Sequence, residues 1–418
     1  MRITLFVPTF PKLSETFIVA KFIGLLDQGH DVNIVCLESN TDDWEAFPSL
    51  NQRVGVRDRV LAIGSCAISV TGAMKCLSTF ARLLQRTGLV LPVRYLFSKA
   101  KCNTTVALSS LGVEMALAAR APDVIHFEFG GVAPPYLGVR AISNAAVVVS
   151  FRGYDINYVG LEDPAHYVQV WQCAAGIHTL GADLWSRTVR RGCPEDIPHT
   201  FIPPAIDTMF FSRFMAYEPV IAGTAHRPIR IVSVGRLGWK KGYEYALASV
   251  RALLDRGLSV EYRIIGAGDY LEPLAFCRRQ LGLEQHVEFV GAANRTIVRS
   301  ELERADLFLH PAVSEGFCNA VVEAQSMQLP VVCTDADGLP ENVSDGVTGI
   351  VVPRRDEHQM ATAIEQLAAN GERRLAMGKA GRHRAVLLYR IDQQIAAFEK
   401  FYNRVVERDG LGSSYSSQ

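Results

Sequence analysis

The sequence lacks net charge, paired cysteines and a long apolar run. It carries 43 basic and 43 acidic side chains, so charge gives no reason to expect a nucleic acid partner. The nine cysteines form no C-x-x-C pair, which is typical of reduced thiols rather than disulfides or zinc ligands. The uncharged stretch 60–74 is too short and too rich in glycine and serine to span a bilayer. We therefore expect a cytoplasmic protein.

Common nucleotide-binding signatures are also missing. No G-x-x-x-x-G-K-[ST] sequence is present, and Gly266-Ala267-Gly268 lacks the third glycine of a dinucleotide-binding fingerprint. Neither a P-loop enzyme nor a dinucleotide-dependent enzyme is supported, and we expect no cofactor.

Acidic residues are absent from one long segment. Residues 59–113 contain lysines and arginines between leucines and aromatic residues, but no Asp or Glu. Such a segment is typical of a surface that rests on anionic lipid. It fits equally well a helical pair whose apolar face is core and whose cations are solvated. Both interpretations stay open.

Strands alternate with helices along the chain, in two series. The first has expected strands at 2–7, 31–37, 124–127, 146–151, 176–179 and 199–202, with a helix from Ser14 to Gln28. The second has expected strands at 229–234, 261–265, 287–290, 306–310 and 330–334, helices at 244–255, 272–281, 299–304 and 319–327, and further helices at 356–370, 373–388 and 392–408. This order predicts an α/β protein with two facing Rossmann-like, doubly wound domains and a C-terminal helical segment.

The domain boundaries follow from the pauses in this pattern. We expect an N-terminal domain at 1–209, a linker at 210–228, a C-terminal domain at 229–388, a helix at 389–408 that packs back on the first domain, and a flexible Gly/Ser-rich tail at 409–418. Two facing domains of this kind bind ligands in a cleft at the carboxyl ends of their strands.

Two glutamates, Glu315 and Glu323, follow the expected strand 306–310. Glu315 lies in a glycine turn, and Glu323 lies about one and a half turns into the next helix. A strand, a tight turn and a helix N-terminus together present free backbone N–H groups to an anion. Carboxylates beside such donors suit a ligand that is phosphate at one point and polyol at another. A nucleotide sugar fits this description.

Two cations, Arg236 and Lys241, follow the first strand of the second domain. When a sugar leaves a nucleoside diphosphate, the growing charge is stabilised by a metal or by fixed cations and backbone dipoles. Arginine offers a planar fork for phosphate oxygens, and lysine offers a mobile ammonium group. Taken alone, the two would be solvated loop cations. Together with the Glu315 turn, they favour a diphosphate site.

The order and spacing of these motifs resemble the retaining glycosyltransferases of family 4, which have the GT-B fold. The resemblance rests on Gly235-Arg236…Lys241-Gly242, Ile265-Gly266-Ala267-Gly268, Glu315-Gly316-Phe317…Glu323-Ala324, Leu329-Pro330-Val331-Val332, Asp337-Gly338-Leu339-Pro340-Glu341 and 346–353. It is close over residues 229–353 and looser in the first domain. There, Ser14-Glu15-Thr16-Phe17 resembles exopolysaccharide enzymes of the colanic acid type.

The resemblance implies a role for each site residue. Glu315 would contact hydroxyls of the transferred sugar, and Glu323 would bind the ribose. Arg236 and Lys241 would hold the diphosphate, with help from the amides of Gly316, Phe317 and Cys318 and from the strand end at Gly266. The implied reaction retains the anomeric configuration, because a leaving-phosphate oxygen takes the acceptor proton on the same face. No metal is expected, and Asp335-Ala336-Asp337, despite its D-x-D spelling, is expected to be a plain loop.

The sequence departs from the family at Arg152, where many members have a histidine. Arginine can bind phosphate or an acceptor oxygen but cannot act as a base near neutral pH. Either Arg152 has a binding role, or His126 or Glu128 compensates, although a lone histidine at a strand end is more often structural. A non-glycine loop at 8–14 also replaces the usual first loop. The expected acceptor side is therefore Ser14, Glu15, His126 and Asp155.

The sequence thus predicts a transferase that moves a sugar from a nucleotide diphosphate sugar to a glycan or lipid-linked acceptor in surface polysaccharide biosynthesis. Its expected location is the cytoplasm, including a peripheral position on the inner face of the cell membrane through residues 59–113. Two alternatives stay open. A nucleotide-sugar 2-epimerase can share two doubly wound domains, and a non-catalytic nucleotide-sugar-binding subunit would explain Arg152.

Overall fold

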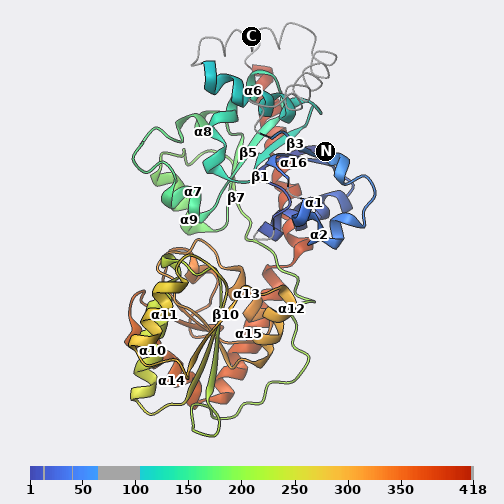
Figure 1. Ribbon diagram of the computed structural model, residues 1–418. Coiled ribbons are helices and arrows are strands. Elements are labelled where there is room, and N and C mark those ends of the chain that lie inside the picture. Colours follow the sequence, from blue (N-terminus) through green and yellow to red (C-terminus); the bar gives the residue numbers. More distant parts are fainter. Residues whose placement is uncertain (13–14, 40, 65–103, 416–418) are drawn as a thin grey trace. The chain divides into compact units, whose positions relative to one another are not determined.

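The chain folds into two compact units. The computed structural model describes all residues except 13–14, 40, 65–103 and 416–418 (Figure 1). The first unit consists of Met1–Ile202 and Gln394–Gln418, and the second of Pro203–Gln393. Ser14 and most of the acid-free stretch 59–113 lie outside the described residues.

The first unit contains a parallel seven-stranded sheet in the order β3-β2-β1-β4-β5-β6-β7. Its strands are β1 (Arg2–Thr9), β2 (Asp31–Glu38), β3 (Val60–Ala62), β4 (Val124–Phe127), β5 (Ala146–Phe151), β6 (Gly176–Thr179) and β7 (His199–Phe201). Its helices include α1 (Thr16–Asp27), α2 (Thr41–Glu45), α3 (Pro48–Asn51), α6 (Thr104–Ala118), α7 (Gly153–Tyr158), α8 (Val168–Cys173) and α9 (Ala182–Arg190). Every residue of β5 is buried, as expected for a parallel strand covered on both faces.

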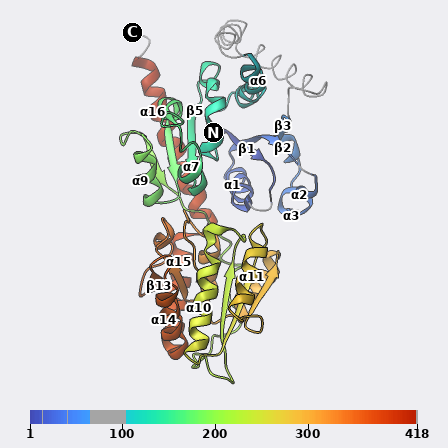
Figure 2. The ribbon, with the colours of Figure 1, turned by 60° about the vertical axis from the view of Figure 1, so that its left-hand side comes forward.

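The second unit contains a parallel six-stranded sheet in the order β10-β9-β8-β11-β12-β13. Its strands are β8 (Ile229–Val234), β9 (Val260–Ile265), β10 (Val287–Gly291), β11 (Leu307–His310), β12 (Val331–Thr334) and β13 (Gly349–Val352). Its helices are α10 (Tyr243–Asp255), α11 (Leu271–Gln280), α12 (Arg295–Arg304), α13 (Asn319–Ser326), α14 (Glu357–Ala369) and α15 (Gly371–Leu388). Helices α10 and α14 lie side by side in both ribbon views (Figures 1 and 2).

Each sheet has a topological switch point, where the strand order reverses. It lies between β1 and β4 in the first unit and between β8 and β11 in the second. Open α/β sheets bind ligands at the carboxyl ends of the strands that flank this point. The loops after β8 and β11 carry the Arg236, Lys241 and Glu315 positions. The topology therefore brings these three residues to the ligand-binding edge.

The predicted fold class is confirmed, and several strands have the predicted ends. Strands β4, β5, β6 and β8 match or nearly match the sequence-based ranges because they are short buried apolar runs. Residues 210–228, predicted as a linker, pack on the second unit, where Phe211 is buried and Arg227 is paired with Asp306. Helix α16 (Ile391–Tyr415) continues beyond 408, into the region predicted as a flexible tail.

Helix α16 belongs to the first unit although the chain reaches it from the second. Its buried residues Phe398, Phe401 and Tyr402 lie on one side of the helix, and Phe401 and Val405 pack close to Gly176 of β6. None of the described helices combines the length and apolar composition that a bilayer-spanning helix needs.

Candidate functional site

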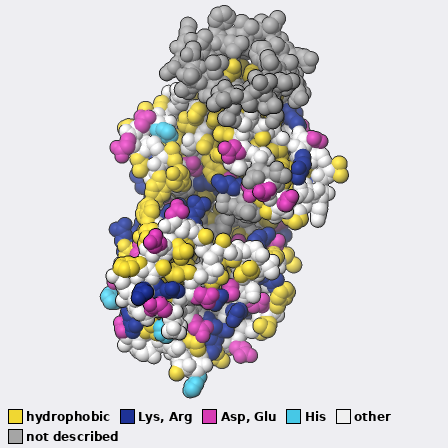
Figure 3. Space-filling view, viewed as in Figure 1, with side chains coloured by type: hydrophobic (Ala, Val, Ile, Leu, Met, Phe, Trp, Pro, Cys, Tyr) yellow, Lys and Arg dark blue, Asp and Glu magenta, His cyan; other side chains and the backbone are white. Residues whose placement is uncertain are grey.

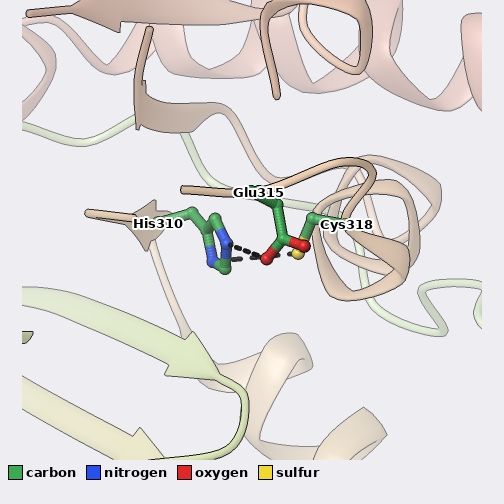
Figure 4. Close-up of side chains that lie close together, drawn as sticks. All are labelled: His310, Glu315 and Cys318. Carbon is green, nitrogen blue, oxygen red and sulfur yellow. Dashed lines mark hydrogen bonds and ion pairs between the residues drawn. The ribbon is translucent and has the colours of Figure 1, made fainter. Parts of the chain in front are cut away.

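The Glu315 carboxylate lies in a cluster of side chains at the end of β11 (Figure 4). Lys241 Nζ forms an ion pair with Glu315 Oε2. His310, the last residue of β11, places Nε2 3.3 Å from the same oxygen and Nδ1 3.8 Å from Cys318 Sγ. The strand end and the two loops thus converge on one carboxylate, as the switch point predicts.

The cluster fixes the charge of Glu315. Burial raises the pKa of a carboxyl group, but the Lys241 ammonium and the His310 hydrogen bond outweigh burial and lower the pKa of Glu315 to about 2. Burial also lowers the pKa of Lys241, but Glu315 more than offsets it, so the pKa of Lys241 is raised. At neutral pH the site therefore contains a carboxylate and an ammonium in direct contact.

The backbone of the Glu315 turn keeps two amides available for a ligand. Within the described residues, the N–H groups of Gly316 and Phe317 have no hydrogen-bond acceptor. The Cys318 N–H, expected as a third donor, instead donates to Asn342 Oδ1 at 3.0 Å. The anion-binding turn expected from the sequence is thus reduced to two adjacent amides.

Glu323 is partly buried on α13, and its carboxyl group makes no hydrogen bond or ion pair with another described residue. Burial raises the pKa of Glu323 to about 7, and Arg295 lowers it only in part. A carboxyl group without a protein partner has its oxygens available for ligand hydroxyl groups.

Glycines shape the loops around these residues. Gly242 has φ +63°, and a Cβ there would lie 2.2 Å from the Pro311 carbonyl oxygen, so only glycine lets the loop with Lys241 approach β11. Gly266 has φ +148°, and a Cβ there would lie 1.9 Å from the Gly235 carbonyl oxygen. Gly266, expected on the donor side, therefore packs directly against the loop that carries Arg236. Arg236 itself is exposed and has no hydrogen-bond or ion-pair partner in the described parts of the chain.

Three side chains of the cluster have the chemistry of zinc ligands. One ligand atom from each of His310, Glu315 and Cys318 lies within 4.8 Å of the others. A histidine coordinates a metal through one ring nitrogen, whereas His310 turns Nδ1 to Cys318 and Nε2 to Glu315. Lys241 already contacts the Glu315 oxygen that a metal would need. The three side chains are thus joined by hydrogen bonds to one another and, through Glu315, to Lys241.

The D-x-D sequence lies in the loop after β12, where the sequence predicted a loop. Arg354 pairs with both carboxylates, through Nε to Asp335 Oδ1 and through Nη1 to Asp337 Oδ1, each at 3.2 Å. Arg354 thus bridges the two carboxylates of the D-x-D sequence.

Arg152 lies at the end of β5 in the first unit. Its Nη2 contacts Glu128 Oε2 and its Nε donates to the Glu128 carbonyl oxygen, both at 3.2 Å. The guanidinium carbon lies 4.0 Å from the centre of the Phe17 ring. Nη1 has no acceptor among the described residues. One edge of the guanidinium is thus fixed, and the other remains available for a ligand.

The other acceptor-side candidates have structural partners. Asp155 accepts the backbone N–H groups of Gly131 and Arg152, both at 2.9 Å, and so caps the start of α7. Glu15 is paired with Lys12 at 2.8 Å. His126 is fully buried, with Nε2 2.6 Å from Ser150 Oγ, and burial holds its pKa well below the usual value. His126 is therefore a neutral core residue, and it does not replace the missing family histidine.

Sequence reasoning missed Lys21, which is buried beneath Arg152. Lys21 Nζ lies 2.5 Å from Glu128 Oε1 and 2.9 Å from His126 Nδ1, and it lies 3.6 Å from the Phe398 ring of α16. Burial lowers the pKa of Lys21 to about 8 despite Glu128. The available signal was a lysine on the apolar face of α1, beside Ile18, Phe22 and Leu25.

Comparison with solved structures places the fold in the GT-B class of glycosyltransferases. Sucrose-phosphate synthase from Thermosynechococcus elongatus superimposes with a TM-score of 0.73 at 15% identity, over 98% of this chain and 100% of that chain. HepE of Anabaena in complex with UDP has a TM-score of 0.71 at 14% identity, over 96% of this chain and 100% of that chain. At these identities the likeness shows the fold alone.

Sequence comparison finds similar proteins among the glycosyltransferases. Residues 218–384 match the family model of the glycosyl transferases group 1. The putative colanic acid biosynthesis glycosyltransferase WcaL of Salmonella typhimurium is 28% identical, over 88% of this chain and 91% of the relative. The amylovoran biosynthesis glycosyltransferase AmsK of Erwinia amylovora is 26% identical over the same shares. The chain is thus similar to group 1 glycosyltransferases (family 4), and the predicted resemblance is confirmed.

Proposed function

We propose that this glycosyltransferase moves a sugar from a nucleotide diphosphate sugar, with retention, to a glycan or lipid-linked acceptor in surface polysaccharide biosynthesis. The observation that carries the proposal is the ionised Glu315, held by Lys241 and His310 beside two available amides. Two relatives are named for exopolysaccharide biosynthesis, and a protein of the same fold binds UDP and UDP-glucose. These relatives support a nucleotide sugar as donor.

The second unit is proposed as the donor domain. Lys241, Arg236 and the amides of Gly316 and Phe317 would stabilise the diphosphate, and the carboxyl group of Glu323 would accept hydroxyl groups of the ribose. Glu315 would contact the transferred sugar. Fixed cations and dipoles supply the positive charge in this arrangement, so we propose that transfer needs no metal.

The first unit is proposed as the acceptor domain, with the open edge of Arg152 as its contact for a phosphate or acceptor oxygen. An arginine does not remove a proton near neutral pH. The acceptor hydroxyl would therefore pass its proton to the leaving-phosphate oxygen. In that step the bond from the anomeric carbon to phosphate breaks, and the bond to the acceptor oxygen forms on the same face.

We also propose that the protein works at the inner face of the cell membrane, because residues 59–113 carry cations and no acid. Flotation with vesicles that contain anionic lipid at low salt is the measurement. Recovery of the protein only in the unbound fraction would contradict this location.

The transfer reaction is tested with a panel of nucleotide sugars and extracted lipid-linked glycans, with product detection by mass spectrometry and no added metal. Glu315→Gln should lower kcat about 10²–10³-fold, as expected for loss of a preorganised group at the reacting sugar. Binding of UDP to the variant, measured as thermal stabilisation, should persist.

Two outcomes would contradict the proposed function. Release of an epimerised nucleotide sugar without acceptor would identify a 2-epimerase. No transfer product from the unaltered protein, with UDP still stabilising it, would favour a non-catalytic binding subunit. Equal turnover by Glu315→Gln and the unaltered protein would contradict the proposed role of Glu315.

A further inference from the structure

Asp337 has a backbone conformation that is uncommon for a residue other than glycine. Its φ is +51°, in the left-handed region, and it lies between β12 and the short helix Leu339–Glu341. Such a conformation is unfavourable for a residue with a side chain and persists where surrounding contacts hold it. The carboxylate of Asp337 makes these contacts.

This carboxylate joins the Glu315 loop to a neighbouring arginine. Oδ2 accepts hydrogen bonds from Ser314 Oγ at 2.6 Å and from the Glu315 N–H at 3.2 Å. Oδ1 accepts from Arg354 Nη1 at 3.2 Å. The side chain is only 7% exposed, so water competes little for these bonds.

The next residue, Gly338, holds the carbonyl group of Glu315. The Gly338 N–H donates to the Glu315 carbonyl oxygen at 3.0 Å. A Cβ at 338 would lie 2.4 Å from the Gly316 carbonyl oxygen, so glycine is needed for this approach. The left-handed turn at Asp337 thus directs both the Asp337 carboxylate and the Gly338 N–H to the backbone of Glu315.

We propose that Asp337 is a positioning residue, whose carboxylate and left-handed turn set the orientation of Glu315 and of the Gly316 amide toward the sugar diphosphate. This role rests on the proposed function of Glu315. Within the D-x-D sequence, Asp337 alone is then the clamp on the Glu315 loop, and Arg354 holds its second oxygen.

Two variants separate positioning from stability. Asp337→Gly removes the carboxylate but places a glycine at the left-handed position, so the relieved backbone offsets part of the lost hydrogen bonds, and the variant should still fold, with a modestly lower melting temperature. Its kcat should fall about 10²-fold, because small misplacements of a reacting group have effects of this size. The KM for the donor should change much less than kcat. Asp337→Asn keeps the shape and one acceptor oxygen, so its loss of kcat should be smaller, about tenfold.

Asp335→Asn is the matched control. Asp335 is 51% exposed and contacts Arg354, but it makes no hydrogen bond to the Glu315 loop among the described residues. The control should retain the kcat of the unaltered protein. Equal losses in Asp335→Asn and Asp337→Asn, with rates that depend on added Mn²⁺, would overturn the proposal in favour of a metal-binding pair.

Hydrogen exchange tests the clamp without any turnover. Peptides that contain the Glu315 amide should exchange faster in Asp337→Gly, because this variant loses the acceptor of that amide. Their exchange rate should be unchanged in Asp335→Asn, which keeps the acceptor. If no donor sugar is transferred by the unaltered protein, the proposed function fails while this measurement still decides on the clamp. If Asp337→Gly kept both the exchange rate and the kcat of the unaltered protein, the positioning role of Asp337 would be wrong.

Discussion

Among the described residues, Lys21 of the first unit is paired with Glu128 and Lys241 of the second with Glu315, and the net pKa shifts of the two lysines are opposite although burial lowers the pKa of both. The pKa of Lys241 is raised, whereas the pKa of Lys21 is lowered to about 8. Lys21 lies near a second cation, Arg152, which shares its partner Glu128. One carboxylate therefore pairs with two cations in the first unit, whereas Glu315 pairs with Lys241 in the second.

Glu323 makes the stability of the protein depend on pH. The pKa of Glu323 is about 7 in the folded chain, against 4.5 for an unperturbed glutamate, because burial disfavours the charged form. Between pH 4.5 and 7 the folded state binds a proton that the unfolded state has lost, so the free energy of unfolding falls as pH rises through this window. Glu323→Gln should remove this dependence, worth roughly 3 kcal/mol at most, since one pKa unit equals about 1.4 kcal/mol. Urea unfolding at pH 5 and pH 8 measures it.

The exposed Glu272 of α11 provides the control for this prediction. Glu272→Gln should show the pH dependence of the unaltered protein. An identical pH dependence in Glu323→Gln would contradict the buried, partnerless state of the Glu323 carboxyl group.

At the scale of elements, the loop between β8 and α10 depends on one glycine. Gly242→Ala would place a Cβ 2.2 Å from the Pro311 carbonyl oxygen at a φ of +63°. The left-handed backbone alone costs about 1–2 kcal/mol, so the free energy of unfolding should fall by about 2 kcal/mol or more. Lys241 should also leave Glu315, which would weaken UDP-induced thermal stabilisation.

Gly238, in the same loop, is the matched control. Its φ is −153°, and a Cβ there would meet no heavy atom within 4 Å. Gly238→Ala should therefore keep both the melting temperature and the response to UDP. If Gly242→Ala behaved like Gly238→Ala, the close approach of the loop to β11 would be wrong.

The sequence predicted those strands and turns whose residue pattern is contained within one short segment. Strand β5 is a continuous buried run, and the Glu315 turn is a local motif, so both were found. Strand β3 has three residues, all half-buried, and β13 has four, two buried and two half-buried, and strands this short show no pattern in the sequence. The Lys21–Glu128 pair joins residues separated by 107 positions. A single sequence does not show that two such distant positions are close in space.

At the scale of the whole molecule, the first unit needs the end of the chain. Deletion of 394–418 removes three buried aromatic residues, Phe398, Phe401 and Tyr402. Phe398 is also the ring that Lys21 contacts. Loss of a buried Phe typically costs 3–5 kcal/mol, so the first unit should not fold stably. Calorimetry should show the transition of the second unit alone.

A chain that ends at Leu411 retains these buried residues and should show both transitions. If the chain lacking 394–418 also retained both, then α16 would not be part of the first unit's core.

The return of α16 to the first unit also orders events during synthesis. Domains that are continuous in sequence fold as they leave the ribosome. Here the second unit is continuous, whereas the first receives its last helix only after 203–393 have been made. The second unit can therefore fold first, although its residues are translated later. Until α16 has been made, the side of the nascent first unit that α16 covers stays open and accessible to holdase chaperones.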